Sequence, residues 1–338
     1  MAGEKEQKKE VNCIGFACLM KTSIGSINGG FSEGNVMTLK KITLPDGRTL
    51  PYVSGQAIRR MLRDRIAEMG ERMSDLHLAS DTGQKGKKSP DFTEGNPEKF
   101  IDDDLFGYLI AEQGQTRRRT APVRVAPAVG LFPYAGDRDL GTKSKEKSTG
   151  DVEAGGSMFE TEISYNVYRT NILVELDRVG VFQELELEKG KTGSIRSIDE
   201  KERKRRLKLL VTALGDLWGG GKQSRLLTDF GPMLIICTFQ ATKKPILLER
   251  MMMNENGELN LEPIKEALSE IKPKNENNVI CGLATGFLPK KNEEEFRKLM
   301  KELNITVDTV STAIEKVCKK IDDMKIPSQT INVAVKQA

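Results

Sequence analysis

The residues best suited to bind an anion gather in one stretch, GDLWGGGKQSRLLTDFGP, at 215–232. Glycine backbone can approach a ligand closely because it carries no side chain. The lysine and arginine that follow would attract negative charge. Such a stretch fits a nucleotide phosphate held for reaction, or the phosphate backbone of a nucleic acid held for binding. The candidate residues are Gly219, Gly220, Gly221, Lys222, Gln223, Ser224 and Arg225.

The spacing of this stretch is not that of a P-loop, which requires Gly, four residues, then Gly-Lys-Ser/Thr. The first glycine position is Asp216 and the hydroxyl position is Gln223. The order of elements is also reversed, because the glycines follow a helix predicted at 197–218, with Ser197 and Glu200 as a capping box. One glycine fits a helix C-cap. Three glycines with a basic tetrapeptide also fit close approach of an anion, and both interpretations stay open.

Other residues that could do chemistry are scarce. The single histidine, His77, lies in a polar segment, and the five cysteines form no CxxC pair. A zinc site of the ordinary kind is therefore not expected. We predict no catalytic residues, no metal and no cofactor, which favours binding over catalysis.

Bulk composition excludes membrane and secreted classes. The chain has 338 residues, a formal net charge of +4 and 30% charged residues. No apolar run approaches the ~20 residues of a membrane span. The N-terminal MAGEKEQKKEV is not followed by the apolar core of a signal peptide. The cysteines are expected to be reduced thiols, and we predict a cytoplasmic protein without membrane contact.

The elements that must position these residues follow a simple order. Strands are predicted at 11–20, 116–132, 165–176 and 231–239, and helices from Ser54 and at 197–218. This order is βαββαβ, so we predict an α+β fold with a ferredoxin-like (RRM-like) core, a plan used by RNA-recognition folds. The aromatic-rich RNP1 sequence is absent, so we expect tracking of the nucleic-acid backbone rather than base stacking on the open sheet.

The segments between these elements are polar or glycine-rich. A Gly/Ser/Asn-rich loop is predicted at 21–35, and Pro-Asp-Gly marks a turn between extended segments within 38–55. A helical turn is expected at 102–114. The stretch 134–159 is too polar to form a core and should protrude. Tail helices are predicted at 293–303 and 307–322.

Five motifs in one order resemble a known family. They are INGGF, VSGQAIRR, DDDLFGYLIA, TRRRTAPVRVAPAV and GGGKQS. Over about residues 11–240 the chain resembles the backbone subunit of type I CRISPR surveillance complexes, in its DevR-type branch, most like subtype I-B.

The resemblance implies a hand-shaped subunit. It implies an RRM-like palm (11–63, 119–132 and 161–290), a helical fingers insertion (64–118), a protruding thumb (133–160) and a C-terminal helical segment (291–338). Copies would stack along the guide RNA, each thumb folding over the RNA held by its neighbour and displacing one nucleotide. The implied partners are CRISPR guide RNA, target DNA, further copies of the chain, the guide 5′-end cap subunit, the guide-processing endoribonuclease, the large and small subunits, and a recruited nuclease-helicase.

The resemblance and the basic stretches together predict an RNA-binding set beyond the glycine-rich stretch. Met158 and Phe159 are candidates for the wedge that displaces a nucleotide, or for anchors of the thumb's base to the palm. Many relatives carry a basic residue after the loop asparagine, where this chain has Gly29. The further residues of the set are Lys21, Asn28, Ser54, Gln56, Arg59, Arg60, Arg117, Arg118, Arg124, Met158, Phe159 and Arg169.

Two other functions compete with a guide-holding role. Type III relatives cut target RNA with an acidic residue in the loop after the first strand, but here 21–35 contains only Glu33 and no aspartate. An autoregulatory DNA-binding protein would need a helix-turn-helix or a comparable base-reading element, which the sequence does not contain.

Overall fold

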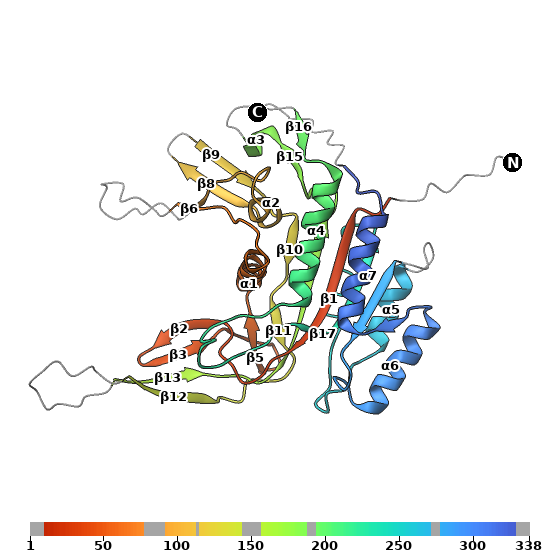
Figure 1. The fold of residues 1–338 in the computed structure, drawn as a ribbon. Helices are drawn as coiled ribbons and strands as arrows, with labels where there is room; N and C mark the ends of the chain where they lie inside the picture. The colour runs from red at the N-terminus through yellow and green to blue at the C-terminus, as the bar shows by residue number, and fades with distance from the viewer. Residues whose placement is uncertain are drawn as a thin grey trace, which may run out of the picture.

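The chain forms a mixed α+β fold around one large sheet (Figure 1). A computed structural model describes residues 10–77, 92–112, 115–143, 157–187, 194–271 and 278–328. The nine-stranded sheet has the spatial order β19 (Val307–Asp308), β18 (Val279–Leu283), β17 (Pro232–Gln240), β1 (Cys13–Lys21), β14 (Val167–Glu175), β11 (Ala128–Gly130), β5 (Thr49–Val53) and β4 (Lys41–Thr43), with β10 (Val123–Val125) also paired to β14.

The centre of the sheet is antiparallel. β1 pairs with β14 on one side and with β17 on the other, and β14 pairs in turn with β10 and β11. The strands predicted at 11–20, 165–176 and 231–239 are thus confirmed, and the structure shows that they are neighbours in the sheet. The prolines at 122 and 127 divide the strand predicted at 116–132 into short pieces, because proline cannot donate to a sheet ladder.

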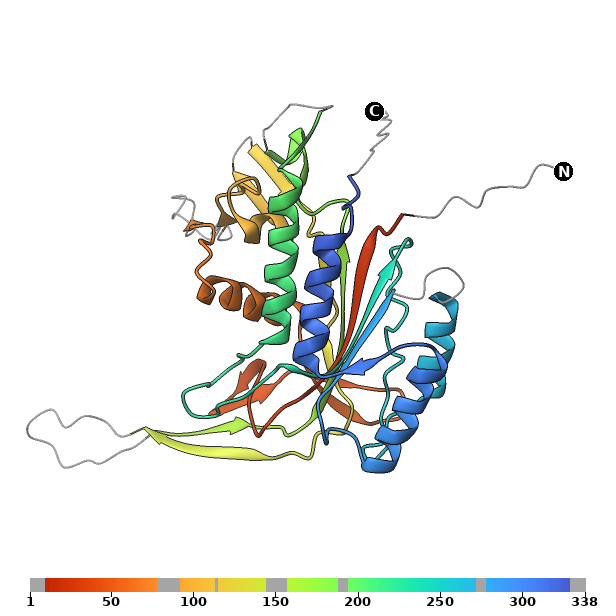
Figure 2. The same cartoon turned by 45° about the vertical axis from the view of Figure 1, so that its right-hand side comes forward.

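Helices cover both faces of the sheet (Figure 2). Alternate residues of β1 therefore enter two cores. Phe16 and Cys18 pack with α1 (Gly55–Glu68), α4 (Glu200–Gly215) and α7 (Val310–Asp323), whereas Ala17 and Leu19 pack with α5 (Glu262–Ile271) and α6 (Lys290–Glu302). Burial on both faces explains why this strand is a continuous apolar run.

A second sheet of four strands projects from the first (Figure 1). Its order is β12 (Arg138–Lys143), β13 (Ser157–Glu162), β3 (Val36–Leu39) and β2 (Gly29–Glu33). The prediction of a loop over 21–35 is wrong for its second half, because β2 pairs there with β3. Of the polar stretch predicted to protrude, 144–156 lies outside the described residues, and the rest supplies β12 and part of β13.

The fingers insertion predicted at 64–118 is not mainly helical in its described part. After α1 it contains β6 (Leu76–His77), β7 (Phe92–Thr93), the short α2 (Ile101–Phe106), β8 (Tyr108–Glu112) and β9 (Gln115–Arg119). The helical turn expected at 102–114 stops at Gly107, which has φ 68°. A Cβ there would lie 2.3 Å from the Arg119 carbonyl oxygen, so only glycine allows the chain to turn into β8 beside β9.

Three consecutive aspartates of α2 are buried, and two of them fasten this region to α1 and α4. Asp102 accepts a hydrogen bond from Arg63 at 2.5 Å. Asp104 pairs with Arg119 at 2.6 Å and with Arg206 of α4 at 2.8 Å, and all three side chains are almost fully buried. The aspartates of the DDDLFG motif are therefore structural, since buried charges require such partners.

Helix α4 is shorter than predicted. It spans Glu200–Gly215 rather than 197–218, and its N-cap is Asp199, which accepts from the Glu202 N–H. Ser197, predicted as the cap, belongs instead to β16 (Ile195–Ser197). This strand pairs with β15 (Val181–Gln183), and the short helix α3 (Glu184–Leu187) lies between the two strands in the sequence. The tail helices occur as α6 and α7, and α7 packs into the main core. None of the described helices is both long and apolar enough to cross a membrane.

Candidate nucleic-acid interface

The glycine-rich stretch forms a loop beside α1, after α4 has ended. The C-cap of α4 is Asp216, with φ −103°. The interpretation of a glycine as the cap is therefore wrong. Gly219 and Gly220 instead have φ of 135° and 111° within the loop, a backbone region that residues with a side chain rarely adopt.

The glycines allow this loop to pack against the protein's own backbone. The Gly221 N–H donates to the Ile27 carbonyl at 3.0 Å. A Cβ on Gly220 would lie 3.0 Å from the Ile27 carbonyl oxygen, and one on Gly221 2.6 Å from that of Ser26. The close approach that the sequence assigned to RNA is thus made by the segment after β1. The structure thus gives Gly220 and Gly221 a packing role, and their contact with RNA stays a prediction.

The Gln223 side chain is engaged within the same loop. Its amide nitrogen donates to the Gly219 carbonyl and to the Thr228 hydroxyl, and its amide oxygen accepts from the Thr228 N–H at 3.0 Å. Both of its N–H bonds are therefore used. Gln223 holds the loop closed rather than offering a donor to RNA, contrary to the prediction.

Helix α1 is fixed to the same place by its N-terminus. Ser54 is the N-cap, as predicted, and its hydroxyl accepts from the Ala57 N–H at 3.3 Å. Asn28, one residue beyond the segment that the glycines touch, accepts from the Ser54 N–H at 2.9 Å. Asn28 and Ser54 thereby position α1 against the loop, and Gln56 is exposed on its first turn.

Two cations of this region have no partner among the residues that the structure describes. Arg59, half-buried on α1, makes no ion pair there, and burial together with the nearby Arg63 lowers its pKa. Lys222 is exposed at the loop and has φ 61°, unusual for a residue with a side chain. Arg60, in contrast, pairs with Asp64 at 2.9 Å. Lys222 on the loop and Arg59 on α1 are therefore the cations without an ion-pair partner, and Ser224 is exposed on the loop close to Lys222 in sequence.

Arg225 connects the loop to the four-stranded sheet. Its guanidinium lies 3.1 Å from Asp139 of β12, donates to Thr161 of β13 at 3.1 Å, and stands 5.0 Å from the centre of the Phe159 ring. These three residues share one face of the sheet, as their strand pairing requires. Met158 points to the opposite face and is 60% exposed. Phe159 is therefore the anchor of this sheet, and Met158 is the exposed candidate for a wedge.

The other predicted residues lie elsewhere. Arg124 and Arg169 face the side of the main sheet opposite α1, where Arg124 pairs with Glu175 and Arg169 lies 3.5 Å from Glu249. We leave these two out of the site.

The remaining predicted cations lie in the fingers region and at the end of β1. Arg117 donates to the Leu187 carbonyl at 2.6 Å, and Arg118 is exposed on β9. Lys21 ends β1, with its ammonium 5.7 Å from the centre of the Tyr165 ring. These residues extend the surface but do not join the loop.

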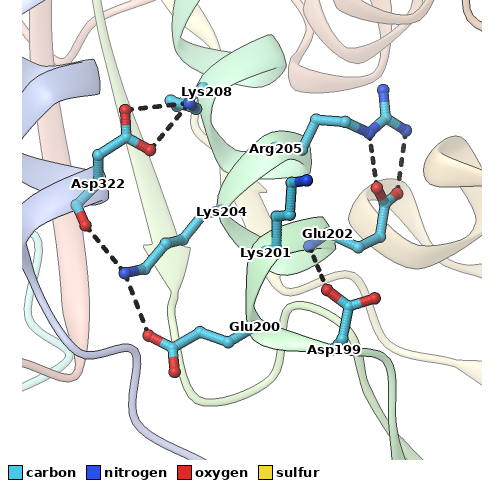
Figure 3. Close-up of a pocket in the computed structure, with 8 residues that line it drawn as sticks. All are labelled: Asp199, Glu200, Lys201, Glu202, Lys204, Arg205, Lys208 and Asp322. Atoms are coloured by element: carbon cyan, nitrogen blue, oxygen red, sulfur yellow. Dashed lines mark hydrogen bonds and ion pairs between the residues drawn. The ribbon is translucent and has the colours of Figure 1, made fainter.

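A pocket lined by charged side chains lies on α4 and α7, away from the glycine-rich loop (Figure 3). Three of its four cations are engaged by carboxylates or carbonyls: Lys204 lies 3.2 Å from Glu200, Lys208 lies 2.8 Å from Asp322 of α7, and Arg205 lies 2.6 Å from Glu202. Lys201 carries no such bond in this view. The lining holds four basic and four acidic side chains, so it braces two helices and offers no excess positive charge.

One feature of the site was missed from the sequence. An open cavity of ≈ 440 Å³ lies between α1 and the loop, and Trp218 lines it. The signal was available, because Trp218 is the only tryptophan of the chain and directly precedes the glycines. Among the described residues, no group of three or more His, Cys, Asp or Glu side chains is arranged to hold a metal ion.

Comparison with known proteins agrees with the motifs. The sequence model of the family described as CRISPR-associated negative auto-regulator DevR/Csa2 matches residues 20–256. A CRISPR-associated protein Cas7/Cst2/DevR of Myxococcus xanthus (strain DK1622) is 29% identical over 159 residues, covering 42% of this chain and 52% of that protein. The chain thus spans about half the length of this curated relative.

Solved structures share the fold. A chain of a CRISPR RNA-guided surveillance complex in a pre-nicking state has a TM-score of 0.60 at 12% identity, covering 91% of this chain and 100% of that chain. A chain of another CRISPR RNA-guided surveillance complex has a TM-score of 0.54 at 15% identity, covering 91% and 99%. Since the family match extends over more than half of the sequence, the chain belongs to the DevR/Csa2 family of CRISPR-associated proteins.

Proposed function

We propose that the protein is a non-catalytic backbone subunit that binds CRISPR guide RNA and oligomerises along it in a type I, I-B-like surveillance complex. The observation that carries this proposal is the joint between α1 and the glycine-rich loop. Asn28 and Ile27 hold the two together, Lys222 lies on the loop without an ion-pair partner among the described residues, and Arg59 lies on α1 beside Arg63, likewise without one. Such a surface suits a phosphate backbone, because it offers charge without base-reading side chains.

In this proposal the fold has the palm, fingers and thumb of the hand-shaped subunit. The palm would be ferredoxin-like. Its sheet would consist of β17, β1, β14 and the broken strand β10 and β11, and its helices would be α1 and α4. The four-stranded sheet carries the thumb, and the region after α1 forms the fingers. Guide pairing with target DNA would then leave sequence recognition to the RNA, while the protein holds its backbone. Further copies and the other subunits of the complex would be the protein partners.

The salt dependence of RNA binding tests the proposal. Replacing Arg59 by Gln or Lys222 by Gly should remove one phosphate contact each. The slope of log K against log salt is negative, and each replacement should make it less steep by about 0.7, the value per phosphate of a single strand. The effect should be equal for two unrelated RNA sequences. Lys291→Ala is the matched control, since Lys291 is a highly exposed cation of α6, a helix that packs on the face of the main sheet opposite α1. A loss confined to one sequence, or no change in slope, would contradict the proposal.

The nuclease alternative is tested in the same samples. Glu33, the only acidic residue of the segment after the first strand, lies exposed in β2. Incubation of a matched RNA with the protein and a divalent metal ion should leave the RNA intact. Regularly spaced fragments that disappear in Glu33→Gln would support the type III-like function instead.

A further inference from the structure

The cavity between α1 and the glycine-rich loop has an aromatic wall. Trp218 retains 40% exposure, a large value for the most hydrophobic side chain of the site. Met61, Ala57 and Ile27 supply further apolar surface beside Gly219 and Gly220. The rest of the lining is polar or charged: Arg60, Asp64, Arg65, Glu68 and Gln223. An aromatic side chain left open in a concave, mostly apolar site is a common feature of ligand-binding cavities.

The indole ring is held in place before any ligand arrives. Its N–H donates to the Glu68 carboxylate of α1 at 3.3 Å. The backbone of Trp218 forms an antiparallel bridge with Asp229. Next to it, the Cβ position of Gly219 lies 3.1 Å from Met61 Cγ, so the loop is packed tightly on the helix. A ring fixed in this way loses little conformational entropy on binding.

The charges around the cavity do not suit a phosphate. Arg60 pairs with Asp64 at 2.9 Å, and Arg65 pairs with Glu68 at 2.7 Å. Asp216 adds a third carboxylate, 3.9 Å from Arg65. Two arginines thus face three acids, and an anion entering the cavity would meet no excess positive charge. A planar ligand that is neutral and has an apolar face fits better.

We propose that this cavity binds one nucleobase of single-stranded RNA, stacked on the face of Trp218. This rests on the proposed function, in which the phosphates lie outside the cavity at Lys222 and Arg59. Every base has a π-face, so stacking of this kind tolerates any sequence. It also supplies the base contact that the main sheet lacks, since the sequence carries no aromatic-rich RNP1 motif.

Fluorescence of the unmodified protein tests the proposal directly, because Trp218 is the only tryptophan. We would titrate it with oligo(U), with oligo(A), and with an abasic oligoribonucleotide of equal length. The two oligonucleotides that carry bases should quench the emission in parallel with binding measured by anisotropy. The abasic one should bind through its phosphates without quenching. Equal quenching by the abasic strand would overturn the assignment.

Variants give a second readout. Trp218→Leu should weaken RNA binding about 5- to 150-fold, the range expected for one stacked base. The salt slope should stay unchanged, because no phosphate contact is lost. Trp218→Phe keeps an aromatic face and should retain most of the affinity. Thermal unfolding of both variants shows whether the loop has remained intact.

Failure of this inference differs from failure of the proposed function. Suppose that RNA binds with a salt dependence that changes when Lys222 is replaced. If the bases then do not quench Trp218 fluorescence and Trp218→Leu does not change the RNA affinity, only the base site is refuted. If single-stranded RNA does not bind at all, both proposals fall. Quenching by polylysine but not by RNA would mean that the three carboxylates and the ring accept a cationic side chain of a protein partner, and the base site would again be refuted.

Discussion

Replacing Gly220 by alanine should destabilise the protein, because the loop packs on the backbone of Ile27. Gly220 has φ 111°, and its Cβ would lie 2.9 Å from Ile27 Cγ2 and 3.0 Å from the Ile27 Cα. A residue with a side chain at positive φ costs roughly 1–2 kcal/mol. The overlap adds an overpacking penalty of about 1–3 kcal/mol. We therefore expect Gly220→Ala to lower the free energy of unfolding by about 2–5 kcal/mol.

A matched control separates the two contributions. Gly47 has φ 86°, and nothing lies within 4 Å of the position of its Cβ. Gly47→Ala should thus show the backbone penalty alone, about 1–2 kcal/mol. Equilibrium urea unfolding of the two variants and the unmodified protein measures the difference. RNA affinity should fall for Gly220→Ala, since the displaced loop carries Lys222, and should be unchanged for Gly47→Ala.

The opposite result has a clear meaning. If Gly220→Ala unfolds like Gly47→Ala yet loses RNA binding, the glycine leaves room for RNA rather than for Ile27. The packing of the loop on the segment after β1 would then be wrong as the reason for the glycines.

Four further changes have distinct expected outcomes. Lys222→Gly should raise the free energy of unfolding by up to about 1 kcal/mol, because φ 61° suits glycine, and it should lower the RNA affinity. If stability and RNA affinity both fell to the same extent, the role of Lys222 as a free cation would be refuted. Arg225→Met should lower stability by about 1 kcal/mol and speed amide exchange in β13, whereas unchanged exchange would show that Arg225 does not anchor this sheet. Asp104→Asn should cost about 3–5 kcal/mol in urea unfolding, because Arg119 and Arg206 lose a buried partner. Burial raises the pKa of Asp103, so the folded state binds more protons than the unfolded state above the usual aspartate pKa, and stability falls as pH rises there; Asp103→Asn should remove this slope and leave stability at neutral pH equal or higher.

Local signals in the sequence predicted the parts of the fold that depend on neighbouring residues. The serine at 54 begins α1, the Pro-Asp-Gly turn separates β4 from β5, and the apolar runs at 11–20 and 231–239 are strands. Each depends on a cap, a turn or a pattern within a few residues.

Distant contacts explain what the sequence did not reveal. The glycines after α4 are plain in the sequence, but the backbone they approach is at Ile27, at the other end of the chain. Three aspartates in a row are usually exposed, and their burial depends on Arg119 and Arg206. The predicted set of basic residues mixed the two faces of the main sheet, because strand pairing, not sequence, decides on which face Arg124 and Arg169 lie.

The central claim is that several copies hold one RNA through its backbone and leave it uncut. The most direct measurement is the mass of the complexes formed on single-stranded RNAs of increasing length, with a divalent metal ion present. The account predicts that the number of bound copies rises stepwise with RNA length, that two unrelated sequences give the same steps, and that the RNA mass stays intact. One copy bound at every length, or RNA recovered as regular fragments, would contradict it.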